Sequence, residues 1–124
     1  MNFEIIFYEE NGKSQIAEFL NTLDNKLLAK VLRNIDLLSE YGNLLGMPFS
    51  RYIGNGIFEL RTKGKDSIIR ILYFFQSGKK IIITNGFIKK QQKLPIDEYK
   101  KALNTKEKYI KMQGGKDEGN TATS

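Results

Sequence analysis

The sequence predicts an α+β fold, in which an N-terminal strand and two helices pack on a twisted antiparallel sheet and a C-terminal helix follows. Two observations lead to this prediction. The spacing of apolar residues changes from a helical period to the period of strands after Pro48, and short polar turns separate the strand-like segments. With 124 residues, the chain is expected to form a single domain over residues 1–112, followed by a polar tail, 113–124, that we expect to be disordered.

The first half of the chain predicts one strand and two helices. Residues 3–8 (FEIIFY) are mostly β-branched or aromatic, as is typical of a short strand. Ser14 suits the N-cap of a first helix, because apolar residues at helical spacing follow it. A second apolar stripe occupies residues 27–41, and Gly42 suits its C-terminal stop. Both stripes therefore predict helix surfaces that face the core.

The second half predicts three strands and a helix. Residues 57–63, 67–75 and 80–88 are rich in β-branched and aromatic side chains, and the links between them are short enough to require antiparallel neighbours. Pro95 suits the first turn of a helix that we expect to end near Met112. The two N-terminal helices are expected to cover one face of the sheet, which leaves the opposite face for a functional site.

The composition removes several classes of catalytic chemistry. The chain has no Cys and no His, so it forms no disulfide, no thiol nucleophile, no Ser-His-Asp triad and no Cys/His zinc site. No apolar segment approaches the roughly 18 to 20 residues that span a bilayer. The N-terminus also lacks the basic segment and apolar run of a signal peptide. We therefore expect a cytoplasmic protein, without membrane association, whose chemistry uses Lys, Arg, Tyr, hydroxyl and carboxylate groups.

The positive charge is concentrated in the second half of the chain. Residues 1–60 carry five basic and eight acidic side chains, a net charge of −3, whereas residues 61–111 carry fourteen basic and four acidic ones, a net charge of +10. A single-sign cluster of this size attracts a polyanion, most often nucleic acid. A solvated, lysine-rich surface without a partner is the alternative that charge alone leaves open.

Two arginines in the predicted strands are the first candidates for a site. The period of two places Glu59 and Arg61 on the same face, and Arg70 lies in the middle of the next, apolar strand. A guanidinium in such a strand is either paired or displayed in a cleft, since an unpaired buried charge is very costly. Pairing of Glu59 with one of these arginines is the structural alternative. Lys89 and Lys90 end the third strand, close to the same end of the sheet.

Aromatic side chains alternate with these basic residues. Tyr73, Phe87 and Tyr99 lie among them in the sequence, Lys63 ends the predicted strand 57–63, and Lys93 follows the predicted strand 80–88. RNA bases stack on aromatic rings while phosphates meet cations, so this combination favours RNA binding. Core packing is the alternative role for each aromatic residue, and it is weakest for the tyrosines, whose hydroxyls need a polar partner.

Four segments in this order carry a family resemblance. They are GNGIFELR (54–61), RILYFF (70–75), ITNGFIKKQQKLP (83–95) and EYKKAL (98–103). Over about residues 50–110 the chain resembles the RelE/ParE toxin superfamily, and within it the HigB-type, phage-protein-related branch. The resemblance implies a microbial-RNase-like fold and a ribosome-dependent endoribonuclease that cleaves mRNA in the A site. It also implies a toxin–antitoxin hetero-oligomer with a cognate helix-turn-helix, HigA-like antitoxin.

The resemblance also assigns site residues by motif position. Arg61, Arg70, Lys89 and Lys90 match the family's basic active-site positions, and Tyr99 matches more loosely a catalytic Tyr of some relatives. The chain departs from the family in having no His, which argues against a histidine-based acid–base scheme.

No cofactor or metal is expected, because RNA itself supplies the attacking 2′-OH. Only four carboxylates occur in residues 61–111, without an obvious ligand spacing.

Two other functions remain open at this point. A ParE-like inhibitor of DNA gyrase would have the same fold, although protein binding alone would not require the basic residues at several catalytic positions. A non-enzymatic, basic RNA-binding or regulatory module would explain the charge without chemistry.

Overall fold

A computed structural model of the chain describes residues 2–89 and 95–121. It has the α+β fold that the sequence predicts. The elements in chain order are β1 (Glu4–Phe7), α1 (Gln15–Leu20), α2 (Asn25–Tyr41), the 3-10 turn η1 (Gly42–Leu44), β2 (Ser50–Gly54), β3 (Ile57–Lys63), β4 (Ile68–Gln76), β5 (Lys80–Lys89) and α3 (Ile96–Thr121).

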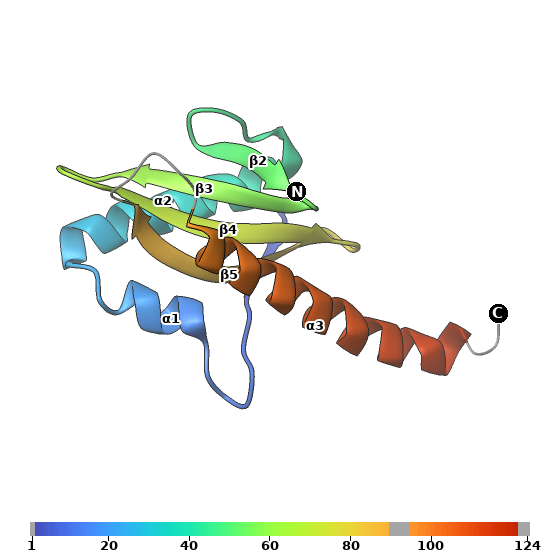
Figure 1. Cartoon of the computed structure of the whole chain (residues 1–124). Helices are drawn as coiled ribbons and strands as arrows, with labels where there is room; N and C mark the ends of the chain where they lie inside the picture. Colours follow the sequence, from blue (N-terminus) through green and yellow to red (C-terminus); the bar gives the residue numbers. More distant parts are fainter. Residues whose placement is uncertain (1, 90–94, 122–124) are drawn as a thin grey trace.

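The five strands form one sheet in the order β1-β5-β4-β3-β2 (Figure 1). Strands β3, β4 and β5 are the predicted antiparallel meander. The sheet is mixed rather than wholly antiparallel, because β1 pairs in parallel with β5. The short edge strand β2 was not predicted, since the segment SRYIG has few of the alternating apolar residues that indicate a strand.

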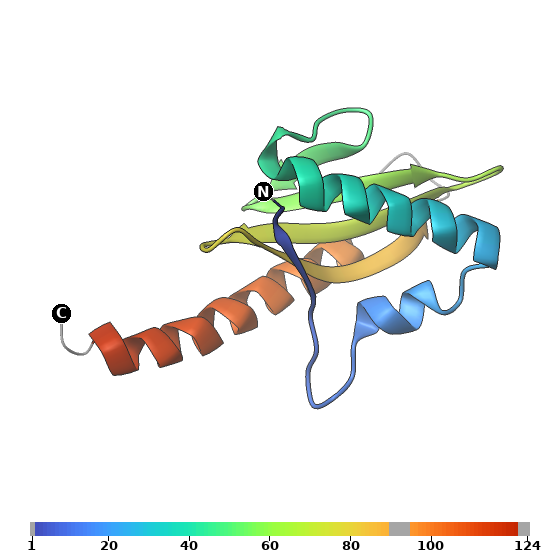
Figure 2. The same cartoon turned by 180° about the vertical axis from the view of Figure 1, so that it is seen from behind.

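Helices α1 and α2 cover one face of the sheet, as Figure 2 shows from behind. The Ser14 hydroxyl caps α1 by accepting a hydrogen bond from Ala17 N at 3.1 Å, and the Asp24 carboxylate caps α2 through Leu27 N at 2.8 Å. Gly42 ends α2, as predicted, and its φ of 54° is one that favours glycine. The buried residues of both helices, such as Ile16 and Val31, pack on Ile71 and other residues of the sheet.

Helix α3 crosses the opposite face, where it buries Ala102 and Tyr109 against Leu72, Phe74 and other residues (Figure 1). The sheet therefore has a hydrophobic core on each face, and α3 covers part of the face that was expected to stay open for a site. The helix continues to Thr121, so its predicted end near Met112 was placed too early. The prediction rested on the loss of apolar residues, whereas the backbone hydrogen bonds of a helix do not need an apolar face. Residues 113–121 are thus helical and not disordered as predicted, and residues 122–124 lie outside the described residues.

No helix within residues 2–89 and 95–121 is both long and apolar enough to cross a membrane.

Candidate anion-binding site

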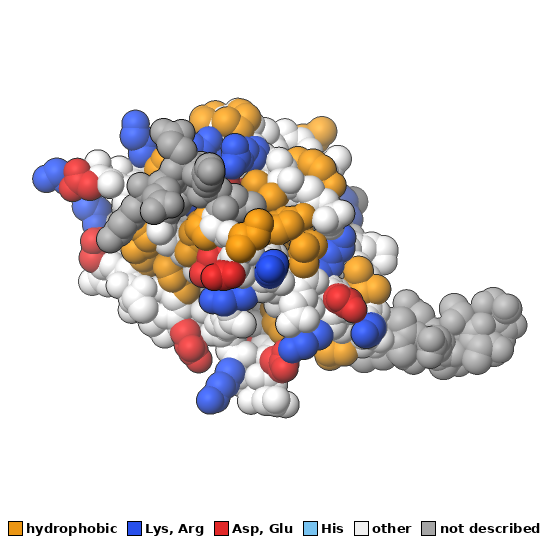
Figure 3. All heavy atoms as spheres, in the orientation of Figure 1, with side chains coloured by type: hydrophobic (Ala, Val, Ile, Leu, Met, Phe, Trp, Pro, Cys, Tyr) orange, Lys and Arg blue, Asp and Glu red, His pale blue; other side chains and the backbone are white. Residues whose placement is uncertain are grey.

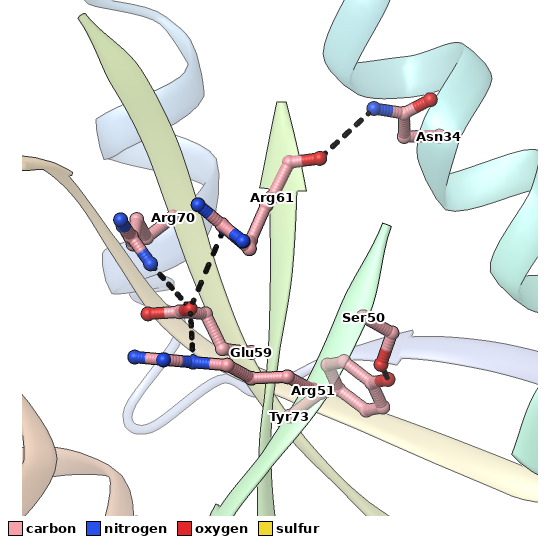
Figure 4. A network of polar contacts seen from close by, with 7 residues as sticks. All are labelled: Asn34, Ser50, Arg51, Glu59, Arg61, Arg70 and Tyr73. Atoms are coloured by element: carbon pink, nitrogen blue, oxygen red, sulfur yellow. Dashed lines mark hydrogen bonds and ion pairs between the residues drawn. The ribbon is translucent and has the colours of Figure 1, made fainter. Parts of the chain in front are cut away.

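Four charged side chains meet on the α3 face of the sheet, beyond the part that α3 covers (Figure 4). Arg61 of β3 lies directly opposite Arg70 of β4, and Glu59 of β3 lies directly opposite Arg51 of β2. Because side chains alternate along a strand, Glu59 and Arg61 share one face, as the sequence predicted. The pairing of three neighbouring strands thus gathers three arginines around one glutamate.

All three arginines contact the same oxygen of Glu59. Its Oε1 accepts a hydrogen bond from Nη1 of Arg70 at 2.5 Å, and the Nε atoms of Arg51 and Arg61 lie 3.2 Å and 4.0 Å from it. Arg61 and Arg70 would repel each other as directly opposed like charges, and the shared carboxylate offsets that repulsion. The sequence left open which arginine pairs with Glu59; the structure shows a cluster with two positive charges in excess.

The three arginines differ in their exposure to solvent. The exposed side-chain fraction is 42% for Arg51, 24% for Arg61 and 7% for Arg70, while Glu59 is fully buried. Arg70, predicted as a catalytic residue, is therefore an inner member of the cluster. Arg51 and Arg61 are the members that face solvent, and only they are open to direct contact with a large anion.

The cluster adjoins a small cavity at the open edge of β3. The backbone N–H of Arg61 donates a hydrogen bond to Phe49 O. Beyond this point, strand β2 no longer pairs with β3. A cavity of about 230 Å³ lies there. It is lined by Asn34, Pro48, Phe49, Arg61, Lys63 and Ile68. Figure 3 shows Lys and Arg side chains gathered over the region of β2 and β3, next to hydrophobic ones. Lys63, predicted to bind RNA, is thus exposed beside Arg61.

Tyr73 does not belong to this site, which corrects the prediction that it binds RNA. Its side chain is 1% exposed and packs against Phe58 and Phe75 on the face of α1 and α2. Its hydroxyl is satisfied by Ser50, and burial raises the pKa of the Tyr73 hydroxyl to about 12. The period of two already separates Tyr73 from Arg70, because side chains an odd number of positions apart, here three, point to opposite faces of a strand.

Phe87 and Tyr99 lie on the α3 face, in different surroundings. Phe87 is directly opposite Arg70 in the sheet but is only 8% exposed, as part of the apolar core under α3. Tyr99 is partly buried, and its hydroxyl accepts a hydrogen bond from Asn55 Nδ2 at 2.9 Å. Asn55 belongs to the turn between β2 and β3, whereas Arg61 lies toward the other end of β3. Core packing, the alternative stated for each aromatic residue, accounts for Phe87.

The predicted lysines are only partly covered by the structure. Lys89 is the last residue of β5, and its backbone lies opposite Ile68 of β4. Lys63, the last residue of β3, lies opposite Ile68 on the other side, so both lysines are at the same end of the sheet. Lys90 and Lys93 lie outside the described residues.

Arg51 is the functional candidate that the sequence reasoning missed. The signal available was the dipeptide Asn55-Gly56, which is typical of a hairpin turn and directly follows the segment Ser50–Gly54 that pairs with β3. Recognising that hairpin would have placed Arg51 opposite Glu59. Among the described residues, no group of three or more Asp, Glu, His or Cys side chains is placed to hold a metal ion.

A comparison with family models gives a match to the family described as phage-derived protein Gp49-like, over residues 18–107. The chain belongs to this Gp49-like family. A comparison with curated proteins gives no match.

Among solved structures, the Gp49-like chain is similar to a chain in the crystal structure of the archaeal RelE–RelB complex from Pyrococcus horikoshii OT3. The identity is 18% and the TM-score 0.52, with 73% of this chain and 99% of that chain covered. The likeness shows a RelE-like fold, and together with the family match it confirms the resemblance to the RelE/ParE superfamily.

Proposed function

We propose that the protein is the toxin of a type II toxin–antitoxin system and a ribosome-dependent endoribonuclease that cleaves mRNA. The observation that carries this proposal is the cluster of Arg51, Arg61 and Arg70 around Glu59, which displays two excess positive charges on a RelE-like sheet. Forked guanidinium groups suit phosphate, because each presents several donors in a fixed plane. The RelE-like fold and the Gp49-like family support the same function.

The chemistry requires no metal or cofactor, since the RNA brings its own nucleophile. The 2′-OH attacks the adjacent phosphate, which gives a 2′,3′-cyclic phosphate and a free 5′-OH. Arg51 and Arg61, the exposed arginines, neutralise the charge that develops on the phosphate. Arg70 is buried and acts on the substrate through Glu59, whose position it fixes.

The remaining predicted residues keep supporting roles in this proposal. Lys89 and Lys90 are assigned to charge stabilisation or proton donation, and Lys63 and Lys93 to the flanking phosphates. Tyr99 is assigned to the same face as the arginines, near the turn at Asn55. A lysine or tyrosine acting as the base would have to lose its proton about 3 pH units below its reference pKa near 10, a cost of about 4 kcal/mol.

An antitoxin partner follows from the same proposal. The structure of the RelE–RelB complex contains a RelE-like fold with its partner, and we propose an equivalent cytoplasmic hetero-oligomer here, with a helix-turn-helix, HigA-like antitoxin. The net charge of +10 over residues 61–111 favours an acidic partner surface, so the association rate is expected to fall as salt rises.

The test uses purified protein with two substrates. Ribosome complexes programmed with mRNA are expected to show cleavage within the A-site codon, with a 2′,3′-cyclic phosphate at the new end. Arg61→Ala is expected to abolish it, while Lys13→Ala, on the loop before α1, leaves it unchanged. A supercoiling assay with DNA gyrase runs in parallel. Intact mRNA together with inhibited gyrase would overturn the nuclease proposal in favour of the ParE-like function.

A further inference from the structure

The arginine cluster contains three buried polar atoms without a hydrogen-bond partner in residues 2–89 and 95–121. They are Glu59 Oε2, Arg61 Nε and Arg70 Nε. Glu59 directs only Oε1 to the arginines, so its second oxygen is an acceptor left open in the middle of the cluster. Each buried polar group left unpaired costs about 1–3 kcal/mol, and native structures contain few of them. Three such atoms in one place indicate a site that a ligand completes.

The chemistry of these atoms defines the ligand that fits. Glu59 Oε2 needs a donor, while the two arginine Nε atoms need acceptors. A ribose 2′-OH beside a phosphate supplies both within one nucleotide: the hydroxyl donates and the phosphate oxygens accept. A phosphodiester without an adjacent hydroxyl, as in DNA, supplies acceptors alone, and a second carboxylate close to Glu59 would be repelled.

We propose that Glu59 Oε2 accepts the proton of the attacking 2′-OH, an assignment that rests on the nuclease function proposed above. In this step the 2′-O–H bond breaks and its proton goes to Glu59, the 2′-O–P bond forms, and the P–O5′ bond breaks. The leaving 5′ oxygen takes a proton from water, and the hydroxide produced takes the proton from Glu59. The carboxylate is thereby restored for the next substrate.

Arg51 is the cluster member that we expect to move when the substrate enters. Glu59 is fully buried, so RNA reaches Oε2 only when a side chain around it moves. Arg51 lies on an edge strand, is the most exposed of the three arginines, and is held at the site by its 3.2 Å contact with Glu59. A phosphate that pairs with the Arg51 guanidinium replaces that contact and leaves Glu59 held by Arg70 at 2.5 Å.

A second acidic side chain on this side of the sheet is already occupied by hydrogen bonds. Glu98 of α3 accepts hydrogen bonds from Asn85 Nδ2 at 3.0 Å and from Lys101 Nζ at 3.4 Å, one on each oxygen. It has no open acceptor comparable to Glu59 Oε2, which makes Glu98→Gln a matched control for the loss of one carboxylate.

Single-turnover cleavage of mRNA on programmed ribosomes tests the assignment. Glu59→Gln is expected to lower the rate by about 10²- to 10⁴-fold, the usual contribution of general acid–base catalysis. Glu59→Gln also leaves the buried Arg70 without its counter-charge, so its melting temperature is expected to fall, and the rates are compared at a temperature at which the variant is folded and binds the ribosome complex. Glu98→Gln is expected to stay within a few-fold of the wild type. Added formate should raise the rate of Glu59→Ala, by supplying the missing carboxylate, and should not rescue Arg61→Ala.

Each outcome separates the two proposals. Cleavage by Glu59→Gln at the wild-type rate overturns the role of Glu59 and leaves the nuclease function intact. So does a rate loss in Glu59→Ala that formate does not restore, because that result assigns Glu59 only to positioning the arginines. Absence of cleavage by the wild-type protein overturns the nuclease function itself, and the role of Glu59 with it.

Discussion

At the scale of single residues, the site is a balance between buried and exposed charge. Glu59 is the buried anion, Arg70 is its buried partner, and Arg51 and Arg61 are the exposed cations. Removing one member of a buried pair leaves the other unpaired, whereas removing an exposed member loses only a solvent-screened contact. Stability and activity should therefore respond to different arginines.

Arg70→Ala is expected to lower the free energy of unfolding by about 3–5 kcal/mol, because it removes the closest partner of the buried Glu59 carboxylate. Arg51→Ala is the control. Because the contact of Arg51 with Glu59 is exposed to solvent, this variant is expected to lose about 1 kcal/mol or less of the free energy of unfolding. Urea denaturation of both variants measures the difference. Equal losses in the two variants would show that Arg70 does not hold the buried pair.

The raised pKa of Tyr73 predicts that the protein loses stability at alkaline pH. Burial raises its pKa to about 12 from 10.0, so the folded protein keeps this proton where the unfolded chain releases it. The contribution is complete below pH 10 and is lost as the pH rises from 10 to 12, in total about 3 kcal/mol. Urea denaturation between pH 9 and 12 should show a shallower decline in the free energy of unfolding for Tyr73→Phe than for Tyr41→Phe, because Tyr41 is a half-exposed residue. If the free energy of unfolding fell equally with pH in both variants, the loss would not come from the Tyr73 hydroxyl.

At the scale of elements, the spacing of side chains predicts some features and not others. Alternation along β3 placed Glu59 and Arg61 together, and the caps at Ser14 and Gly42 were readable from local sequence. Arg51 was missed because β2 is short, polar and at the sheet edge, so its pairing depends on β3 rather than on its own pattern. The parallel pairing of β1 with β5 joins segments far apart in the chain, which no local period records.

Gly86, in the segment that carries the family resemblance, has a packing role between elements. A Cβ there would lie 2.6 Å from Phe19 Cδ2, so glycine is what lets α1 approach β5. Gly86→Ala is expected to lower the free energy of unfolding by about 1–3 kcal/mol. The loss should shrink in a Phe19→Ala background, and Gly46→Ala, with open space around its Cβ, is the control. A loss equal in both backgrounds would refute the contact with Phe19 as its cause.

At the scale of the whole molecule, the sheet separates a structural face from a face that carries the site. Helices α1 and α2 seal one face, and α3 covers the other only in part, which leaves the arginine cluster beside it. The sequence predicted the fold class and that Arg61 lies on the face opposite α1 and α2, because both follow from periodicity and element order. It did not predict that Glu59 joins all three arginines, since that depends on the register of three strands.

A chain that ends at Met112 is expected to keep the fold. Tyr109 is the last buried residue among residues 95–113, so the core of α3 is complete by that point. Thermal unfolding of residues 1–112 should give a melting temperature within about 5 °C of the full chain, which corresponds to about 1 kcal/mol or less for a domain of this size. A larger decrease would assign a structural role to residues 113–124.

The most direct test of ribosome-dependent mRNA cleavage is a map of 5′ ends on a reporter mRNA in a translating extract. The extract is compared with one depleted of ribosomes, and the wild-type protein with Arg61→Ala, whose partial exposure makes it a gentler change than a substitution at Arg70. Ribosome-dependent cleavage predicts in-frame cuts that disappear without ribosomes and with the variant. Intact mRNA in the presence of folded wild-type protein would contradict it.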